Sequence, residues 1–242
     1  MAKVAILVDG GFYKKTAKTL IDNGNGRTTA KTLIDYCHKH LATGDELYRI
    51  FYYDCKPLTK KVYHPLTKST VDLSKSPLCK WHEDFLDELV QKRKVALRLG
   101  RLSDETASYV LDPKKVKELC DGTITFSDIV EDDFALNVSQ KGVDMKIGVD
   151  IASLAYKKQV DKIILIAGDS DFVPASKLAR REGIDFVLDP LRNHINPDLR
   201  EHIDGLCTKL PSAKVTSSKS KTKPKAKVKA PHKKAAAVAK SK

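Results

Sequence analysis

The chain has 242 residues, of which 44 are Lys or Arg and 31 are Asp or Glu, and its formal net charge is +13. A hydrophobic content of 41% beside 31% charged residues is typical of a globular chain with one sizeable core. No apolar run approaches the roughly 18 residues that a membrane-spanning helix needs. The composition also excludes collagen-like, coiled-coil and disulfide-scaffold proteins.

The N-terminus runs directly into a strand-like segment and lacks the layout of a signal peptide. The five cysteines are an odd number and contain no CxxC pair, which favours free thiols in a reducing compartment. From these two features we expect a cytoplasmic protein.

The positive charge is concentrated at the C-terminal end. Residues 212–242 contain 11 Lys and no acidic or aromatic residue, which leaves 33 basic and 31 acidic side chains in residues 1–211. The end segment cannot bury enough apolar surface to offset its ordering entropy, so we predict a folded domain at 1–211 and a disordered tail at 212–242. Its lysines suit the phosphate backbone of nucleic acid, and the alternative is a tail for solubility or targeting. The densest candidates are Lys221, Lys223, Lys225, Lys227 and Lys229.

Apolar runs and turn residues predict strands that alternate with helices. We expect strands at 3–8, 47–53, 95–99, 162–167 and 184–188. We expect helices at 12–22, 29–40, 80–92, from Pro113 onward, 143–158, 172–182 and 196–206. Residues 56–76 contain two prolines and little periodicity, which predicts a loop, and residues 128–140 are acidic without a clear pattern. Two of the strands are continuously apolar, which is typical of a parallel sheet covered by helices on both faces, so we predict an α/β fold.

Acidic residues follow several of the predicted strands. Asp9 follows the first strand and Asp54 the second, while Asp169 and Asp171 follow the strand at 162–167. The carboxyl ends of parallel strands share one edge, where such sheets bind ligands, so we expect these side chains to converge. Converging carboxylates repel unless a divalent cation neutralises them, and hard oxygen ligands favour Mg²⁺ or Mn²⁺. Such ions support the hydrolysis of phosphodiester bonds.

Each of these acids also has a plain structural role open to it. Asp9 precedes two glycines and is compatible with a turn, and a turn is the favoured role of Asp54. Asp171 is equally suited to cap the helix that follows it. The argument for a metal site therefore depends on the joint placement of the acids.

The helix at 143–158 adds two further acids, Asp144 and Asp150. They are six residues apart, about 240° around an α-helix, so both face one cation only if one of them lies at the start of the helix. Asp144 is suited to project from that start, and Asp150 to flank the core face or to face solvent. The sequence has neither a GxGxxG nor a Walker A loop, so we expect no nucleotide cofactor.

Three segments carry a family resemblance: VAILVDGGFY, KGVDMKIGVDIASLA and LIAGDSDFVPASKLARREGIDFV. In this order they resemble the motifs of the NYN domain family, a LabA-like branch of the PIN-like nucleases, and the resemblance covers residues 3–207. It implies a three-layer α/β/α sandwich of PIN-like, Rossmann-like type, an acidic pocket for Mg²⁺ or Mn²⁺, and single-stranded RNA as the substrate. Position by position, it implies Asp9, Asp144 and Asp169 as metal ligands and Asp171 as a fourth catalytic carboxylate, with Asp150 matching a second acid of the middle motif.

The function predicted from these observations is hydrolysis of RNA by a metal-dependent ribonuclease. Arg101, Lys141 and Lys146 are candidates for contacts with the RNA backbone, although each is equally compatible with ordinary solvated surface. The alternative is a non-catalytic, nucleic-acid-binding regulatory module with the same fold, suggested by the basic tail and by Gly11 and Phe12 where many family members have asparagine. A third possibility is a metal hydrolase acting on small phosphoesters.

Overall fold

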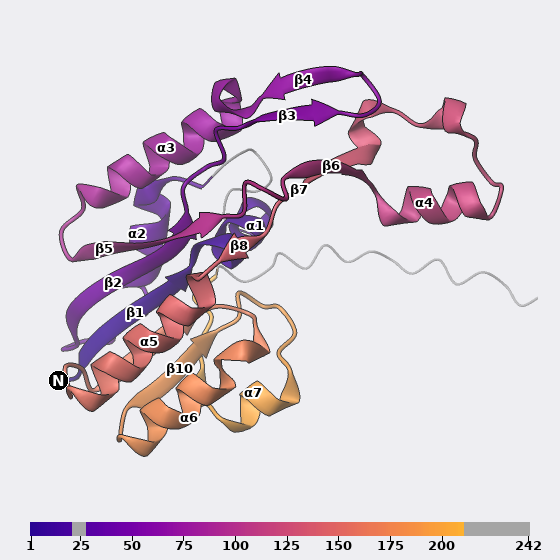
Figure 1. Cartoon of the computed structure of the whole chain (residues 1–242). Coiled ribbons are helices and arrows are strands. Elements are labelled where there is room, and N and C mark those ends of the chain that lie inside the picture. The colour runs from indigo at the N-terminus through magenta and orange to yellow at the C-terminus, as the bar shows by residue number, and fades with distance from the viewer. Residues whose placement is uncertain (21–27, 211–242) are drawn as a thin grey trace, which may run out of the picture. The chain divides into compact units, whose positions relative to one another are not determined.

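The centre of the fold is a seven-stranded sheet with the strand order β11–β10–β9–β1–β2–β5–β8 (Figure 1). The computed structural model describes residues 1–20 and 28–210, so the tail predicted at 212–242 and the end of the helix predicted at 12–22 lie outside the described residues. All neighbouring strands are parallel except β8, which is antiparallel to β5. The strands are β1 (Lys3–Asp9), β2 (Glu46–Cys55), β5 (Val95–Leu102), β8 (Gln140–Lys141), β9 (Lys162–Ile166), β10 (Asp185–Asp189) and β11 (Gly205–Leu206).

Helices cover both faces of this sheet (Figure 1). One face carries α1 (Gly10–Leu20), α2 (Ala30–His38) and α3 (Pro77–Val90), and the other carries α5 (Val143–Tyr156), α6 (Val173–Arg181) and α7 (Pro197–Glu201). The side chains of β1 alternate between the two cores: Ile6 and Val8 pack with α1–α3, and Leu7 packs with α5–α7. This arrangement confirms the three-layer α/β/α sandwich. None of the helices in the described part of the chain is long and apolar enough to cross a membrane.

Local signals in the sequence explain where the helices begin. The Ser76 hydroxyl accepts a hydrogen bond from the backbone N–H of Cys79, and Pro77 occupies the first turn of α3. Thr29 caps α2 in the same way. Gly142 adopts a left-handed conformation with φ of 80° just before α5, which places Asp144 in the first turn of that helix.

The predicted loop at 56–76 is wrong, because this segment forms a hairpin. Its strands are β3 (Lys61–His64) and β4 (Ser69–Asp72). A second pair of short strands, β6 (Ser108–Leu111) and β7 (Phe134–Asn137), flanks the helix α4 (Pro113–Cys120) in the sequence. The His64 ring lies 4.5 Å from the ring of Tyr109 and 5.1 Å from that of Phe134, which joins the two pairs. Strands of four residues are too short to show a period in sequence, and their partners come from distant segments.

The helix predicted at 196–206 is also wrong in its extent. It ends at Glu201, and the chain then forms β11 at the edge of the sheet. The Asp204 carboxylate accepts hydrogen bonds from the backbone N–H of Phe186, at 2.9 Å, and from Arg180 Nε, at 2.8 Å. These bonds hold the chain against β10, where a continuing helix could not lie.

Gly10 is required at the point where β1 turns into α1, and we predict that Gly10→Ala destabilises the protein. A Cβ there would lie 2.6 Å from the Tyr52 ring and 2.7 Å from the Tyr53 carbonyl oxygen. We expect a loss of about 1–3 kcal/mol in the free energy of unfolding, measured by urea titration. The matched control is Gly148→Ala inside α5, where a Cβ meets nothing within 4 Å, and it should be neutral or stabilising by up to about 1 kcal/mol. Equal losses in both variants would contradict the packing argument.

Candidate metal centre

Asp9 is the last residue of β1, between β9 and β2 in the middle of the sheet. Its Oδ1 accepts a hydrogen bond from the backbone N–H of Phe12 at 3.1 Å, which fixes the carboxylate over the start of α1. Burial raises the pKa of Asp9 to about 6; the Phe12 hydrogen bond opposes this, and the negative charge of Asp144 adds to it. The carboxylate is therefore partly desolvated and lies near another acid.

Asp169 lies in the turn that follows β9, the neighbour of β1. Its Oδ1 accepts a hydrogen bond from the backbone N–H of Asp171 at 3.0 Å, so Asp169 caps the short 3₁₀ turn Ser170–Phe172. The capping role considered for Asp171 thus belongs to Asp169. A Cβ at Gly168 would lie 2.5 Å from the Phe12 ring, so this turn packs closely against α1 only because residue 168 is glycine.

Asp144 approaches the same edge from the first turn of α5. Partial burial raises the pKa of its carboxyl, and the negative charges of Asp169 and Asp171 raise it further. These interactions, with the one between Asp144 and Asp9, link the four carboxylates electrostatically. The four acids selected as catalytic from the sequence thus lie close enough for their charges to influence one another.

None of these four carboxylates forms an ion pair with a Lys, Arg or His of residues 1–20 or 28–210. No three of these four acids have carboxylate oxygens within 4.8 Å of one another. Among the described residues, a group that meets this distance is Asp198, Glu201 and His202, at the surface around α7. A set of unpaired carboxylates is chemically suited to a hard divalent cation, which would remove the repulsion between them.

Asp54 is excluded from this group by its own partners. It lies inside β2, not in a turn as predicted, and its buried carboxylate contacts Lys14 Nζ at 2.6 Å and His82 Nε2 at 3.1 Å. The Tyr52 hydroxyl donates a third bond to it at 2.9 Å. Burial alone would raise the pKa of Asp54, but the hydrogen bonds and charges of His82 and Lys14 hold it below its usual value. Asp54 is therefore an ionised carboxylate whose charge is compensated by its partners, and it holds the Lys14 ammonium group in place.

Asp150 also lies apart from the four acids. Its Oδ2 accepts hydrogen bonds from the Tyr53 hydroxyl at 2.8 Å and from Arg98 Nε at 2.9 Å. Of the two helix acids left open by the sequence, the structure thus brings Asp144 to the Asp9 edge and pairs Asp150 with an arginine.

The predicted basic residues lie on the surface near the same edge. Arg101 of β5 is opposite Lys141 of β8 in the antiparallel register, and both side chains are exposed. Lys146 is exposed in the second turn of α5. The tail lysines lie outside the described residues.

A cavity of about 600 Å³ that was not predicted from the sequence lies beside Asp54, on the side of α1 and α3. Lys14, His82 and Gln140 supply polar groups to it, and its apolar lining includes Leu58, Leu73, Leu78, Trp81, Leu102 and Leu136. A Cβ at Gly11 would lie 3.4 Å from Asp9 Oδ1 and 3.5 Å from Gln140 Oε1, so these two side chains face the same small space. Gln140 lines the cavity, so the cavity lies near Asp9, which is not itself one of the lining residues. No signal in the sequence pointed to it, because its lining residues come from distant segments.

Comparison with known proteins supports a family assignment. The NYN domain model matches residues 79–206, just over half of the chain, and includes Asp144, Asp169 and Asp171, while β1 with Asp9 precedes the matched residues. No curated protein matches the chain. A crystal structure of a protein of unknown function from Vibrio parahaemolyticus is similar, with a TM-score of 0.46 and 15% identity, over 85% of this chain and 91% of that one. On the strength of the domain match, the chain belongs to the NYN domain family, a family of PIN-like nucleases.

Proposed function

We propose that the protein is a metal-dependent ribonuclease that hydrolyses phosphodiester bonds of single-stranded RNA. The observation that carries this proposal is the gathering of Asp9, Asp144, Asp169 and Asp171 at one sheet edge, with no basic partner within the described chain. In the proposal Asp9, Asp144 and Asp169 hold Mg²⁺ or Mn²⁺, and Asp171 completes the shell or positions water.

The residues present fit such an ion, because the donors are all carboxylate oxygens and the pKa of Asp9 is raised when no cation is near. A bound divalent ion would supply charge stabilisation at the phosphoryl group and a lowered pKa of water. The chain's own task is to hold the carboxylates fixed. Asp9 is held by the Phe12 N–H and Asp169 by the Asp171 N–H, so neither has to reorganise when substrate arrives.

The large cavity beside Asp54 supports a single-stranded substrate. Its apolar lining suits an unpaired base, which a double helix would keep stacked within itself. Lys14 lies at this cavity with its ammonium group held by Asp54 at 2.6 Å and 20% of its side chain exposed. We assign Lys14 the role of neutralising the phosphate next to the base in the cavity.

The first prediction concerns cleavage. Full-length protein incubated with end-labelled single-stranded RNA and Mg²⁺ or Mn²⁺ should cleave it, and EDTA should stop the reaction. Asp9→Asn and Asp169→Asn should each lower the rate by roughly a hundredfold or more, since each removes a metal-ligating charge. The control is Asp121→Asn, an exposed acid at the end of α4, which should retain full activity.

Absence of metal-dependent cleavage, or equal activity in Asp9→Asn and wild type, would overturn the proposal. A small phosphoester such as a nitrophenyl phosphate serves as a second substrate. If the protein hydrolyses that compound and leaves RNA intact, it is a phosphoesterase of another class.

The second prediction uses the pKa of Asp9. Its value is 3.8 in the unfolded chain and about 6 in the folded one, so the folded state binds more protons between these values. In EDTA this carboxyl therefore lowers stability as pH rises from about 4 to about 6, and the penalty stays constant above that. Asp9→Asn should be more stable than wild type at pH 7.5 by roughly 1–3 kcal/mol, and equally stable near pH 4.

Urea unfolding at pH 4 and pH 7.5 measures this difference, and Mn²⁺ tests its link to the metal. At pH 7.5 Mn²⁺ should stabilise wild type and have little effect on Asp9→Asn, because binding to the folded state alone shifts the equilibrium. Equal stabilisation of both proteins by Mn²⁺ would place the ion elsewhere, with the exposed Asp198 group as the first alternative.

The third prediction separates catalysis from binding by the tail. Deletion of 212–242 removes 11 Lys and should weaken RNA binding and make it less salt-dependent. Metal-dependent cleavage at saturating RNA should persist, because all four carboxylates remain. If truncation abolishes RNA binding, and EDTA has no effect on what the full chain does to RNA, the protein is instead the non-catalytic binding module.

A further inference from the structure

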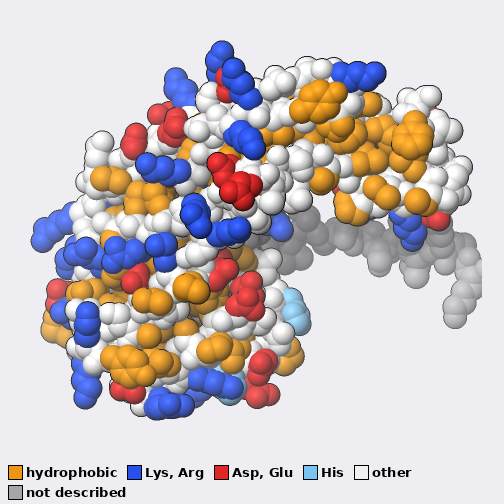
Figure 2. Space-filling model, in the orientation of Figure 1, with side chains coloured by type: hydrophobic (Ala, Val, Ile, Leu, Met, Phe, Trp, Pro, Cys, Tyr) orange, Lys and Arg blue, Asp and Glu red, His pale blue; other side chains and the backbone are white. Residues whose placement is uncertain are grey.

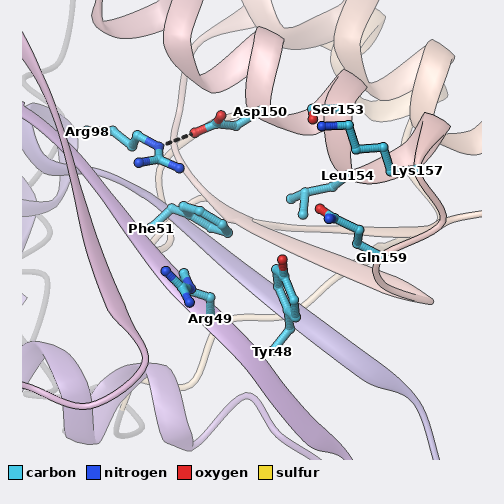
Figure 3. A pocket seen from close by; sticks show the side chains of 9 residues that line it. All are labelled: Tyr48, Arg49, Phe51, Arg98, Asp150, Ser153, Leu154, Lys157 and Gln159. Atoms are coloured by element: carbon cyan, nitrogen blue, oxygen red, sulfur yellow. Dashed lines mark hydrogen bonds and ion pairs between the residues drawn. The ribbon is translucent and has the colours of Figure 1, made fainter.

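A second cavity, of about 270 Å³, lies between α5 and the strands β2 and β5 (Figure 3). It is on the opposite face of the sheet from the large cavity, and neither the family match nor the proposed metal centre accounts for it. The residues that define its chemistry are Tyr48, Arg49, Phe51, Arg98, Asp150 and Lys157. Three of these six are basic and one is acidic, so the lining favours an anion.

Arg98 is held in one orientation within this cavity. Its Nε donates to Asp150 at 2.9 Å (Figure 3). The same carboxylate oxygen accepts a hydrogen bond from the Tyr53 hydroxyl at 2.8 Å. The guanidinium carbon lies 5.2 Å from the centre of the Phe51 ring. The two terminal nitrogens of Arg98 donate to no acceptor in the described chain. A guanidinium fixed through Nε presents those two nitrogens as a pair, the geometry that binds two oxygens of a phosphate.

The cavity has two further basic side chains, Arg49 and Lys157. Arg49 and Lys157 are exposed, and neither forms an ion pair with an acid of residues 1–20 or 28–210. Figure 2 shows Lys and Arg side chains gathered over β2, β5 and the adjoining side of α5. The single acid, Asp150, is already occupied by Arg98 and Tyr53, so it does not repel an incoming anion as a free carboxylate would.

The arrangement of α5 connects this cavity with the metal centre. Lys146, Asp150, Ser153 and Lys157 follow one another at spacings of four, three and four residues, so they lie along one side of the helix. Asp144 is in the first turn of the same helix, about 9 Å along the axis from Asp150 and about 20 Å from Lys157. An extended polyanion on this side of α5 would therefore be led toward the N-terminal end of the helix, where Asp144 lies about 150° around the axis from this side.

We propose that this cavity binds a backbone phosphate of single-stranded RNA, a few nucleotides away from the bond that is cleaved. The proposal rests on the proposed function for the identity of the polymer, and on Arg98, Arg49 and Lys157 for the phosphate. A free phosphate or mononucleotide carries the same chemistry. RNA is favoured because the side of α5 that carries Lys146 and Lys157 leads along the helix to the end at which Asp144 lies.

The experiment is a binding titration of the full chain in EDTA, where cleavage does not interfere. A fluorescein-labelled oligoribonucleotide is followed by anisotropy at several salt concentrations. Arg98→Gln should weaken binding roughly tenfold and make the plot of log K against log salt shallower by about 0.7. Lys157→Gln, an exposed change that leaves the fold intact, should act in the same direction. The control is Arg181→Gln on α6, which removes an equal charge from outside the cavity and should have little effect.

Equal losses for Arg98→Gln and Arg181→Gln would overturn the proposal, because they would indicate net charge alone. It is also overturned if Arg98→Gln abolishes binding of AMP or inorganic phosphate while RNA affinity is unchanged, since the ligand is then a small anion. Binding that depends on Arg98 without any cleavage would disprove the nuclease and keep the phosphate site. If Arg98→Gln and Lys157→Gln both cleave RNA and bind it with wild-type affinity, the nuclease is kept and the phosphate site is disproved.

Discussion

The proposed metal-dependent function depends on one constraint, the mutual repulsion of the carboxylates at one edge of the sheet. Asp9 and the turn that carries Asp169 follow adjacent strands, and the residues just before them, Val8 and Ile166, are completely buried. The strand ends therefore cannot move apart to relieve the repulsion. The pKa of Asp9 is raised mainly by burial, and the negative charge of Asp144 adds to that increase. In our proposal a divalent cation would relieve the repulsion, which would otherwise persist at neutral pH.

Asp54 and Asp150 show that the partner of a carboxylate, and not its position in sequence, decides its role. Asp54 lies near the carboxyl end of a parallel strand, as Asp9 does, yet Lys14 and His82 neutralise it inside the core. Asp150 is paired with Arg98 at the surface of the sheet. Each of these carboxylates orients a basic side chain, Lys14 for Asp54 and Arg98 for Asp150, and each basic side chain lines a cavity. In our proposals these paired acids position the groups that hold RNA, and the unpaired acids hold the metal.

The sequence predicted those features that depend on local pattern or on topology alone. Continuous apolar runs located β1 and β9, and the rule that parallel strands end at one edge selected Asp9 and Asp169. The contacts of Asp54 and Asp150 depend on side chains 28 to 97 residues away, such as His82 and Tyr53. No local pattern encodes such contacts. The hairpin at 56–76 was missed for the same reason, because packing between distant segments stabilises its short strands.

The segments that the sequence could not interpret have a direct bearing on substrate binding. Leu58 and Leu73 flank the β3–β4 hairpin, and Leu136 belongs to β7; together they line the large cavity on the α1 side of the carboxylates. The Arg98 cavity lies on the α5 side, so the two cavities are on opposite faces of the sheet with the carboxylates at the edge. A strand of RNA that occupied both would cross this edge, with a base in the apolar cavity and a phosphate at Arg98. Such a path would bring the intervening backbone to Asp9, and it would require the unstacked, flexible chain that single-stranded RNA provides.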